Sequence, residues 1–489
     1  MGEGTAPDFE ELDVLIVGAG ISGIDGAYHL QKRCPGKRYA ILEARERIGG
    51  TWDLFRYPGI RSDSDMYTLG FPFRPWTGAK SIADGADIRA YVEDTAREFG
   101  IDRHIRFRQR VTKAEWSSAE ARWTVEAETA EGVKRYRTAF LFLGSGYYDY
   151  DNGYRPEWPG EKGFKGRFVH PQFWPEDLDY AGRKIVVIGS GATAVTLIPS
   201  LAETAAHVTM LQRSPSWIVA RPSEDGIART LQRLLPAGAA ARTIRFKNVL
   251  LGMIFFQRSR KRPESVRKLL LGWVAEQLPG HDIETHFTPR YNPWDQRVCL
   301  VPDGDLFRAM REGRASVVTG TIDRFTRTGI RLESGEELEA DIVVTATGLV
   351  MRILGGIAIS VDGAPVNVAE RVSYKGMMLN DVPNMVLSFG YTNASWTLKS
   401  DLTARYFCRL LNYLDRHGLA FCVPRLPAEG VERMPMLDFS SGYVARAEGM
   451  LPGQGTNAPW RLYQNYFKDF AALGMGTVTD GAMEFRKAG

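Results

Sequence analysis

Short apolar runs alternate with a helical pattern over the first 45 residues of the chain. Residues 13–18 (DVLIVG) form a β-branched run that ends at a glycine, which is typical of a buried parallel strand. A helical pattern follows over residues 22–32, and residues 39–43 (YAILE) form the next apolar run. This order predicts a βαβ unit, in which two parallel strands are joined by a helix that covers one face of the sheet.

The same order of elements occurs again in the middle of the chain. Residues 184–189 (KIVVIG), 192–201 and 207–212 predict a second strand, helix and strand. Each unit is followed by short strand-like stretches separated by polar turns, at residues 110–146 and 321–344, as in a β-meander. The repeat predicts an α/β fold with two Rossmann-like domains of one architecture.

Changes of pattern mark the expected domain boundaries. A stretch rich in Tyr, Gly and Pro at residues 147–160 is typical of an interdomain linker, and between residues 221 and 291 the pattern becomes helical, basic and amphipathic. We therefore expect a first domain at 1–150, completed by 384–489, a second domain at 151–222 and 291–383, and a helical insertion at 223–290.

The first predicted unit carries a glycine-rich loop. Gly18, Gly20 and Gly23 form G-x-G-x-x-G between strand and helix, with Ser22 inside the loop. Such glycines allow a pyrophosphate to approach the backbone at the helix N-terminus. Glu43 ends the next strand, where an acid hydrogen-bonds an unphosphorylated ribose. The loop predicts binding of the AMP half of FAD; the alternative is a glycine turn that serves packing alone.

The second unit carries a loop of different chemistry. Its G-x-G-x-x-A sequence comprises Gly189, Ser190, Gly191, Ala192, Thr193 and Ala194. The following strand ends in Arg213 and Ser214, where an NAD-binding domain would have an acid. Arg213 would pair with a 2′-phosphate and Ser214 would donate a hydrogen bond to it, so we predict NADPH as the second dinucleotide. The alternative for Arg213 is a solvated surface arginine.

Composition excludes several classes of protein. A net charge of +4 in 489 residues is too small to indicate a nucleic-acid-binding protein. The four cysteines include no closely spaced pair, which argues against a dithiol centre, a metal site or a disulfide framework and suits a reducing cytosol. Residues 1–11 lack the features of a signal peptide, and no apolar run approaches the ~20 residues of a membrane-spanning helix. We expect a cytoplasmic protein.

Two longer motifs carry a family resemblance. Residues 164–175 match F-x-G-x-x-x-H-x-x-x-W-P through Phe164, Gly166, His170 and Trp174, and residues 49–63 match G-G-x-W-x-x-x-x-Y-P-G-x-x-x-D. Together with the two glycine loops, they resemble the class B flavoprotein monooxygenases of the Baeyer–Villiger type. The stretches YNPWDQR and GYTNASWTL resemble the ethionamide-activating branch of that family.

The resemblance implies an enzyme that holds FAD and NADPH. It would insert one atom of O2 into ketones through a C4a-peroxyflavin, giving esters or lactones, and would also S-oxygenate thioethers or thioamides. The alternatives are an N- or S-oxygenating flavin monooxygenase without ketone activity, a dithiol reductase, which would need a redox cysteine pair, and a non-catalytic flavoprotein. A small-molecule ketone or sulfide and O2 are the expected partners, without nucleic acid, and the sequence indicates no oligomeric state.

The resemblance also assigns residues to the site. Arg297 would lie beside the flavin, where a fixed guanidinium stabilises a peroxide anion and a later oxyanion, and Asp63 would orient it; the alternatives are a structural salt bridge and a surface turn. His170 and Trp174 are expected at the domain junction, in a conformational role. The further residues expected at FAD are Gly50, Thr51, Trp52, Asp53, Leu54, Asp63 and Val111, and those at NADP are Arg61, Ser62 and Asp63.

Two helical stretches leave alternatives open. The helix predicted at residues 398–414 could be capped by Ser395 or Asn393 and direct its positive end at the flavin pyrimidine, or it could be an ordinary core helix. In the insertion, basic residues surround the apolar run 249–256. We expect a lid over the substrate pocket with a solvated basic edge, and the alternative is peripheral contact with an anionic membrane.

Overall fold

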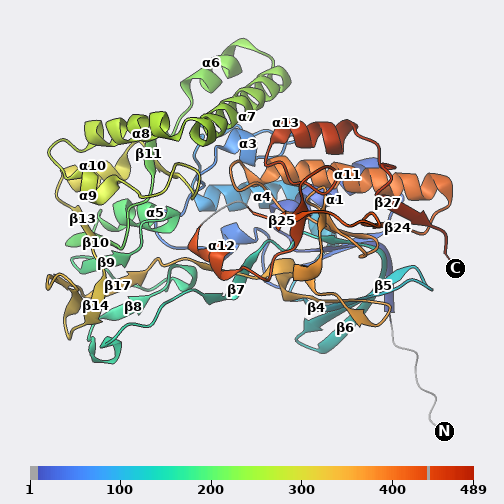
Figure 1. The fold of residues 1–489 in the computed structure, drawn as a ribbon, viewed down its shortest axis with the longest axis horizontal. Coiled ribbons are helices and arrows are strands. Elements are labelled where there is room, and N and C mark those ends of the chain that lie inside the picture. Colours follow the sequence, from blue (N-terminus) through green and yellow to red (C-terminus); the bar gives the residue numbers. More distant parts are fainter. Residues whose placement is uncertain (1–8, 438–440, 489) are drawn as a thin grey trace, which may run out of the picture.

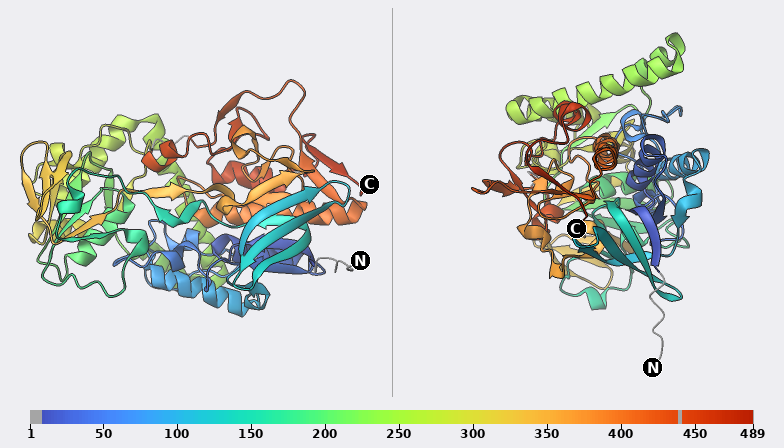
Figure 2. Two further views of the ribbon diagram at one scale, coloured as in Figure 1. Left: turned by 90° about the horizontal axis from the view of Figure 1, so that it is seen from below. Right: turned by 90° about the vertical axis from the view of Figure 1, so that its right-hand side faces the viewer.

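The computed structural model describes residues 9–437 and 441–488 of the chain. The elements form two lobes side by side, with a group of helices along one edge (Figure 1). The first lobe combines N-terminal and C-terminal elements, and the second is formed by the middle of the chain (Figures 1 and 2). Most of the N-terminal stretch in which we expect no signal peptide lies outside the described residues.

The first lobe contains the predicted βαβ unit. Strand β1 (Phe9–Val17) runs parallel to β2 (Tyr39–Leu42), and helix α1 (Ile21–Arg33) connects them. β2 also pairs with the short parallel strand β3 (Ile105–Arg106). The residues of β2 are all buried, as expected for a strand covered on both faces.

The meander adds three antiparallel strands to this sheet. β4 (Arg110–Ser117), β5 (Arg122–Thr129) and β6 (Gly132–Leu143) pair in sequence, and β6 then runs parallel to β1. The same β6 pairs with β23 (Met385–Leu387), so the C-terminal part of the chain returns to the first sheet.

One expected boundary differs from the structure. β19 (Ala358–Val361) pairs with β4 and with β20 (Ala364–Pro365), so residues 358–365 belong to the first sheet rather than to a second domain that extends to residue 383. The pairing joins residues about 245 positions apart. No local pattern of the sequence indicates such a contact, so the boundary predicted at residue 383 lies too far along the chain.

The second lobe is built on a parallel sheet in the order β13, β10, β9, β17, β8. These strands are β8 (Arg167–Val169), β9 (Lys184–Ile188), β10 (His207–Gln212), β13 (Ala315–Thr319) and β17 (Ile342–Thr345). Helix α5 (Ala192–Leu201) follows β9 as predicted. The second meander forms a separate antiparallel sheet of β14 (Ile322–Phe325), β15 (Gly329–Leu332) and β16 (Glu337–Glu339).

The insertion is helical and projects from the body of the molecule (Figure 2, right). It comprises α6 (Gly226–Leu234), α7 (Ala237–Lys261), α8 (Pro263–Gln277) and α9 (Ile283–Phe287). The parallel pair β11 (Ile218–Arg221) and β12 (Cys299–Pro302) stands at its two ends. Among the described helices, none has the length and apolar character needed to cross a membrane.

Where the chain passes between the lobes, β7 (Tyr148–Gly153) pairs antiparallel with β18 (Leu349–Met351). Helix α11 (Trp396–His417) lies against α1, and α4 (Gly85–Glu98) belongs to the same lobe. The remaining α-helices and strands are α2 (Thr51–Leu54), α3 (Met66–Leu69), α10 (Asp305–Arg311), α12 (Gly442–Arg446), α13 (Tyr466–Asp469), β21 (Ser373–Tyr374), β22 (Met378–Leu379), β24 (Phe421–Pro424), β25 (Arg433–Pro435), β26 (Gly453–Gly455) and β27 (Met483–Arg486).

A buried acidic group lies where α1 meets α11. Asp25 is completely buried, and the Nε2 atom of His29 lies 3.6 Å from its Oδ1 and 2.8 Å from Oδ1 of Asp401. Burial raises the pKa of Asp25 well above its ordinary value of 3.8, and the carboxylate of Asp401 raises it further, against the opposing influence of Arg245 and Arg405. The charged form of Asp25 therefore costs stability in the folded protein.

We expect Asp25→Asn to stabilise the protein near neutral pH by about 1–3 kcal/mol, because the neutral amide avoids the cost of ionising a buried carboxyl group beside Asp401. Below pH 3.8 Asp25 is protonated in both the folded and unfolded states, so the gain vanishes there and grows as the pH rises toward the elevated folded pKa. Urea unfolding at several pH values measures the difference. The exposed Glu429→Gln is the control, and an equal gain at every pH would contradict the assignment.

Candidate active site

A cavity of about 570 Å³ extends from the first glycine loop to the second. Gly18, Gly20 and Ser22 line it from the first lobe, and Gly191 and Thr193 line it from the second. Because both loops stand at the carboxyl ends of parallel strands, the cavity occupies the crevice where open α/β sheets bind ligands.

Steric demands explain the glycines of the first loop. Gly18 has φ +96°, and a Cβ atom on it would lie 2.6 Å from the carbonyl oxygen of Gly144. A Cβ atom on Gly23 would lie 1.8 Å from the carbonyl oxygen of Gly18. Gly23 does not line the cavity; it allows α1 to pack against the loop, and so it contributes to the site indirectly.

Glu43 holds the same loop in place. Its Oε2 accepts a hydrogen bond of 2.7 Å from the amide of Ala19, and its Oε1 accepts one of 2.9 Å from the amide of Arg45. Burial raises the pKa of Glu43, whereas these two hydrogen bonds lower it. The carboxyl group lines the cavity, so it can meet a ribose as well as support the loop.

Residues 49–54 divide between the cavity and the protein interior. Gly50, Thr51 and Trp52 line the cavity, as expected for a segment that packs against a flavin. Asp53 does not: it is buried and forms ion pairs of 2.7 Å with Arg45 and 3.0 Å with Arg56. Leu54 also points away, into the apolar core of the second lobe. The structure therefore places neither Asp53 nor Leu54 at the expected FAD contact.

Among the other predicted residues of this region, Ser62, Asp63 and Val111 line the cavity and Arg61 does not. The Nη1 atom of Arg61 lies 2.5 Å from Oδ2 of Asp305 in α10. Arg61 thus joins the two lobes through an ion pair, and the expectation that it binds NADP is not supported by its position.

The centre of the cavity holds a paired guanidinium. Arg297 places Nη2 2.7 Å from Oδ1 of Asp63 and Nε 2.5 Å from Oδ2, a two-point contact, as the resemblance implies. Its Nη1 donates to the carbonyl oxygen of Thr392 at 3.4 Å. The Arg297 side chain is 32 % exposed to the cavity although it lies deep inside the molecule. Burial lowers the pKa of Arg297, but Asp63 raises it above the ordinary value, so the charge is permanent.

Several tyrosines line the cavity near Arg297, and the sequence did not predict their place in the site. The hydroxyl groups of Tyr147 and Tyr148 are 2.7 Å apart, and the Tyr147 ring stacks on Trp396 with centroids 5.2 Å apart. Tyr443 from α12 lines the same wall. For Tyr147 and Tyr148 the available signal was their place shortly after the strand that ends at Leu143, because loops at that end of a parallel strand line the ligand crevice.

Cys299 also lines the cavity and weighs against one alternative. It is buried, and burial raises the pKa of its thiol to about 12. The thiol therefore stays protonated and a poor nucleophile. With no second cysteine among the described cavity residues, the site does not fit a dithiol reductase.

The second glycine loop shows a similar division of roles. Gly189 has φ +134°, and a Cβ atom there would lie 2.3 Å from the carbonyl oxygen of Ala346. Gly191 is different, since a Cβ atom would meet no protein atom within 4 Å. Its neighbours Ala192 and Thr193 line the cavity with it. Gly191 is therefore not required by the fold, and its lack of a side chain leaves open space at the cavity wall.

The flanks of this loop lie outside the cavity. Ala194 is buried in the core, and the hydroxyl of Ser190 donates to the carbonyl oxygen of Ser214 at 3.1 Å. Arg213 and Ser214 are exposed at the end of β10 and do not line the cavity. They stand beside the loop, where the 2′-phosphate of a dinucleotide bound across it would lie.

The fingerprint residues divide between the core of the second lobe and the junction of the lobes. The ring of Phe164 packs against Phe168 in the core, and a Cβ atom on Gly166 would lie 2.4 Å from the carbonyl oxygen of Asp341. The His170 ring lies against the backbone of Gly153 in β7. A Cβ atom on Gly153 would lie 2.1 Å from Cε1 of this ring.

His170 is not placed for chemistry. It does not line the cavity, its Nδ1 accepts a hydrogen bond from the amide of Gln172, and burial lowers its pKa. Trp174 lies nearby, edge-on to Tyr180. This geometry favours the conformational and structural role expected for the motif.

Helix α11 begins at the cavity, where Ala394 and Trp396 line the wall. Ser395 is the N-cap residue, but its hydroxyl lies 2.6 Å from that of Thr68 and caps no backbone amide. The expected capping hydrogen bond is therefore absent among the described residues. Without that cap, the positive end of the helix faces the cavity and is available to a ligand.

Comparison with known proteins agrees with this geometry. Residues 16–79 match the model of an NAD(P)-binding Rossmann-like domain, and residues 79–237 match that of flavin-binding monooxygenase-like proteins. The chain is 56% identical over 480 residues to the FAD-containing monooxygenase EthA of Mycobacterium tuberculosis, covering 98% of both chains. The chain belongs to this family of FAD-containing monooxygenases. It is also 49% identical to a probable FAD-binding monooxygenase, AlmA, of an Acinetobacter species, over 98% of this chain and 97% of the relative.

Solved structures share the fold of this monooxygenase. A steroid monooxygenase bound to NADP matches with a TM-score of 0.75 at 22% identity, over 98% of this chain and 100% of the other. The polycyclic ketone monooxygenase of Thermothelomyces thermophila matches with a TM-score of 0.77 at 16% identity, over 100% of this chain and 91% of the other. The prediction of two Rossmann-like domains in a flavoprotein monooxygenase is confirmed.

Proposed function

We propose that this monooxygenase uses NADPH and FAD to insert one oxygen atom of O2 into ketones, giving esters or lactones, and that it also oxygenates the sulfur of thioethers or thioamides. The observation that carries the proposal is the Arg297–Asp63 pair in the cavity between two glycine loops. FAD, when bound, supplies electron storage and the activation of O2. The names of the structural neighbours, a steroid monooxygenase and a polycyclic ketone monooxygenase, support the carbonyl substrate class.

The residues of the chain supply position and charge. Arg297 offers a permanent positive charge to the oxyanion that forms when a carbonyl is attacked. Asp63 balances that charge and fixes the plane of the guanidinium through two contacts. Because the pair is set in a cavity rather than on the outer surface, a substrate that fills the cavity would displace water and strengthen its electrostatic interaction with Arg297.

The experiment that tests the proposal is product analysis with ¹⁸O2. Purified enzyme, FAD and NADPH are supplied with a mixture of ketones and thioethers, and mass spectrometry follows incorporation of one labelled atom. Labelled esters or lactones support the proposal. Labelled sulfoxides without any ester would favour the second candidate, an N- or S-oxygenating enzyme without ketone activity. Hydrogen peroxide as the sole product would exclude both.

Gly191→Ala should raise the KM for NADPH at least tenfold without lowering stability. The added methyl group meets no protein atom within 4 Å, so the fold is unaffected, but it would occupy the space that a pyrophosphate needs at the start of α5. Steady-state kinetics and thermal unfolding measure the two effects. Gly36→Ala is the matched control, because Gly36 also has open space around its Cβ position and lies outside the cavity. An unchanged KM would remove the loop from the NADPH site.

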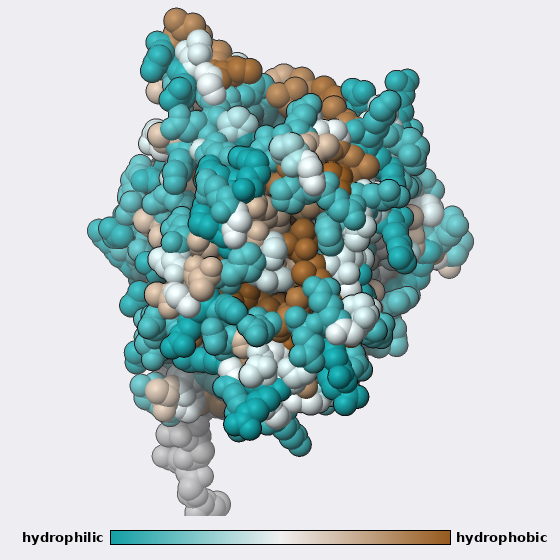
Figure 3. All heavy atoms as spheres, turned by 90° about the vertical axis from the view of Figure 1, so that its left-hand side faces the viewer, coloured by the Kyte–Doolittle hydropathy of each residue, from teal (hydrophilic) through white to brown (hydrophobic). Residues whose placement is uncertain are grey.

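The insertion does not match the expected lid. No residue of 223–290 lines the cavity in the described parts of the chain, although Val249 and Met253 of α7 pack behind the cavity wall in one cluster with Tyr391. Its outer face instead presents apolar side chains. Those more than half exposed are Ile227, Leu234, Phe246, Leu251 and Ile254. Apolar surface is visible along this projecting edge (Figure 3).

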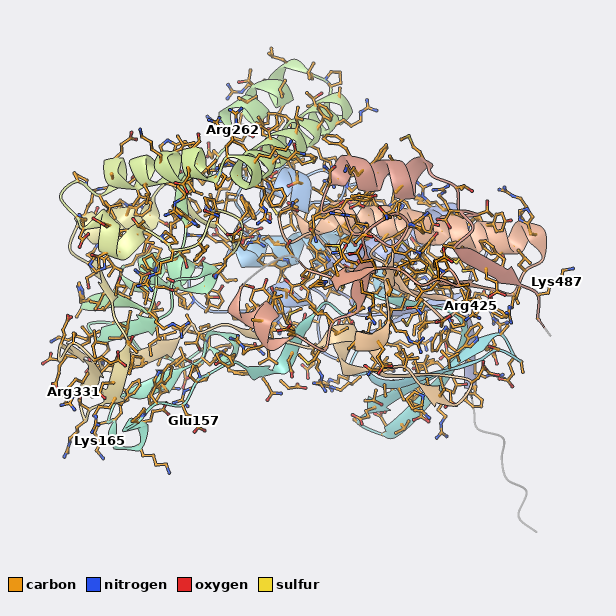
Figure 4. All side chains as sticks on the ribbon, viewed as in Figure 1. Glu157, Lys165, Arg262, Arg331, Arg425 and Lys487 are labelled. Atoms are coloured by element: carbon orange, nitrogen blue, oxygen red, sulfur yellow. The ribbon has the colours of Figure 1, made fainter. Side chains whose placement is uncertain are left out.

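We propose that this face of the insertion rests on an anionic membrane surface. Residues 237–277 carry nine Lys or Arg and two Glu. Arg245 and Arg267 donate to backbone carbonyl oxygens and Lys247 pairs with Asp225. The exposed cations include Arg258, Lys261 and Arg262, the last of which stands at the turn between α7 and α8 (Figure 4). Basic groups beside exposed apolar side chains fit a surface of acidic headgroups and acyl chains.

The double change Leu251→Glu and Ile254→Glu should abolish co-sedimentation with phosphatidylglycerol vesicles. The double change Phe107→Glu and Val133→Glu introduces the same two charges at exposed apolar residues of the first lobe and should leave binding unchanged. Equal binding to neutral phosphatidylcholine vesicles, or none to either, would exclude the proposal.

A further inference from the structure

A lysine without access to solvent lies behind the wall of the cavity. Lys399, in the first turn of α11, has a side-chain exposure of 0 %. Its Nζ atom lies 3.3 Å from Oδ1 of Asp469 and donates to the carbonyl oxygen of Lys375 at 3.2 Å. Burying an ion pair of this kind costs several kcal/mol per ion before the pairing offsets it, and apolar residues of similar volume often stabilise more. Its presence therefore calls for a role other than stability.

The same carboxylate reaches the cavity through a tyrosine. The hydroxyl of Tyr391 donates to Oδ2 of Asp469 at 2.7 Å, and the tyrosine itself is buried and lines the cavity. Asp469 ends the short helix α13, so it comes from a segment about 80 residues further along the chain. One oxygen of Asp469 thus meets Lys399 and the other meets the wall of the site.

The same C-terminal segment also holds the two residues after Tyr391. The Oε1 atom of Gln464 accepts a hydrogen bond of 3.1 Å from the amide of Thr392, and its carbonyl oxygen accepts one of 2.9 Å from the side chain of Asn393. Thr392 in turn offers its own carbonyl oxygen to Nη1 of Arg297. The loop of residues 391–393 is therefore held between the C-terminal segment and the catalytic arginine.

We propose that Asp469, neutralised by Lys399, is a positioning residue that fixes the loop of residues 391–393 and thereby sets the orientation of Arg297. The contact of Arg297 with Asp63 fixes the plane of the guanidinium, and the Thr392 carbonyl selects the direction in which its remaining N–H groups point. A small displacement of such a group lowers the rate of a reaction far more than it lowers stability. Burial lowers the pKa of Lys399, and Asp469 opposes that shift.

The inference rests on the proposed oxygenation, and its test separates the two. The variants are Asp469→Asn and Tyr391→Phe, with Asp480→Asn as the matched control. Asp480 pairs with the buried Lys375 at 2.9 Å and accepts a hydrogen bond from Tyr374, neither of which belongs to the loop of residues 391–393. The measurements are the fraction of NADPH oxidation that yields product rather than hydrogen peroxide, the anaerobic rate of flavin reduction by NADPH, flavin content and thermal unfolding.

We expect Asp469→Asn and Tyr391→Phe each to lower the coupled fraction about three- to tenfold while flavin content is unchanged. Asp480→Asn should lower stability and leave coupling as in the wild type. In Asp469→Asn, Lys399 is left buried without its carboxylate partner, and the double variant Lys399→Met with Asp469→Asn removes it. We expect the double variant to regain thermal stability while its coupled fraction stays low.

Recovery of coupling together with stability in that double variant would overturn the proposal, as would an equal loss of coupling in Asp480→Asn. If the wild type itself forms no product, the proposed function is wrong, and the rate of flavin reduction then tests the positioning role by itself. A threefold slower rate in Asp469→Asn than in Asp480→Asn supports that role. Equal rates in the two variants exclude it.

Discussion

Arg297→Ala should lower kcat for oxygen insertion by about 10²–10³-fold, the usual loss when a fixed donor to an oxyanion is removed. NADPH oxidation should continue, with hydrogen peroxide as its main product, because the substitution leaves both glycine loops intact. Stopped assays that quantify ester, sulfoxide and peroxide from the same reaction measure the change. Arg297→Lys keeps a charge but loses the two-point contact with Asp63, so it should recover only a small part of the rate.

A second arginine of the cavity lining provides the control for this prediction. Arg352 also lines the cavity, but its Nη1 lies 3.2 Å from Oδ2 of Asp151 and 3.5 Å from Oδ1 of Asp149, away from Asp63. Arg352→Ala should leave kcat within a few-fold of the wild type. If Arg297→Ala were equally mild, the positive charge in the centre of the cavity would have no part in the chemistry.

The features that the sequence predicts well are those that local sterics and spacing determine. The two strand–glycine–helix units were predictable because a Cβ atom at Gly18, Gly23 or Gly189 would lie within 2.6 Å of a backbone carbonyl. The same holds for the order of the strands around them, since a right-handed βαβ unit leaves little choice of arrangement. Motif positions such as Asp63 and Arg297 were predictable through the family resemblance, and the structure brings them into contact.

The features that the sequence does not predict depend on contacts between distant residues. Asp53 and Leu54 directly follow two cavity residues, yet the first pairs with arginines and the second enters the core of the other lobe. Arg61 faces α10 for the same reason. A motif specifies which residue types stand at which positions. Whether each side chain points into the cavity or into the core depends on the part of the chain that packs against it. Only the folded chain brings Asp469 to Tyr391.

Arg213→Glu should raise the KM for NADPH by about 10²-fold and leave the KM for NADH unchanged or lower. A hydrogen-bonded charge pair contributes about 1.5–3 kcal/mol, and the substitution also places a negative charge against the 2′-phosphate. The exposed position of Arg213 at the end of β10 leaves it accessible to that phosphate. Steady-state kinetics with both nucleotides give the ratio of the two KM values, and the shift should shrink at high salt because an exposed pair is screened.

Arg183→Glu separates a local contact from a general change of charge. Arg183 is also exposed in the second lobe, but it precedes β9 and so lies at the amino ends of the parallel strands, opposite the glycine loop. The two variants have the same net charge, so any effect of overall charge on an anionic nucleotide is equal in both. A loss confined to Arg213→Glu and to NADPH places the 2′-phosphate at the end of β10. An equal loss in both variants, or a loss that NADH shares, would mean that Arg213 does not recognise the phosphate and that the preference for NADPH arises elsewhere in the site.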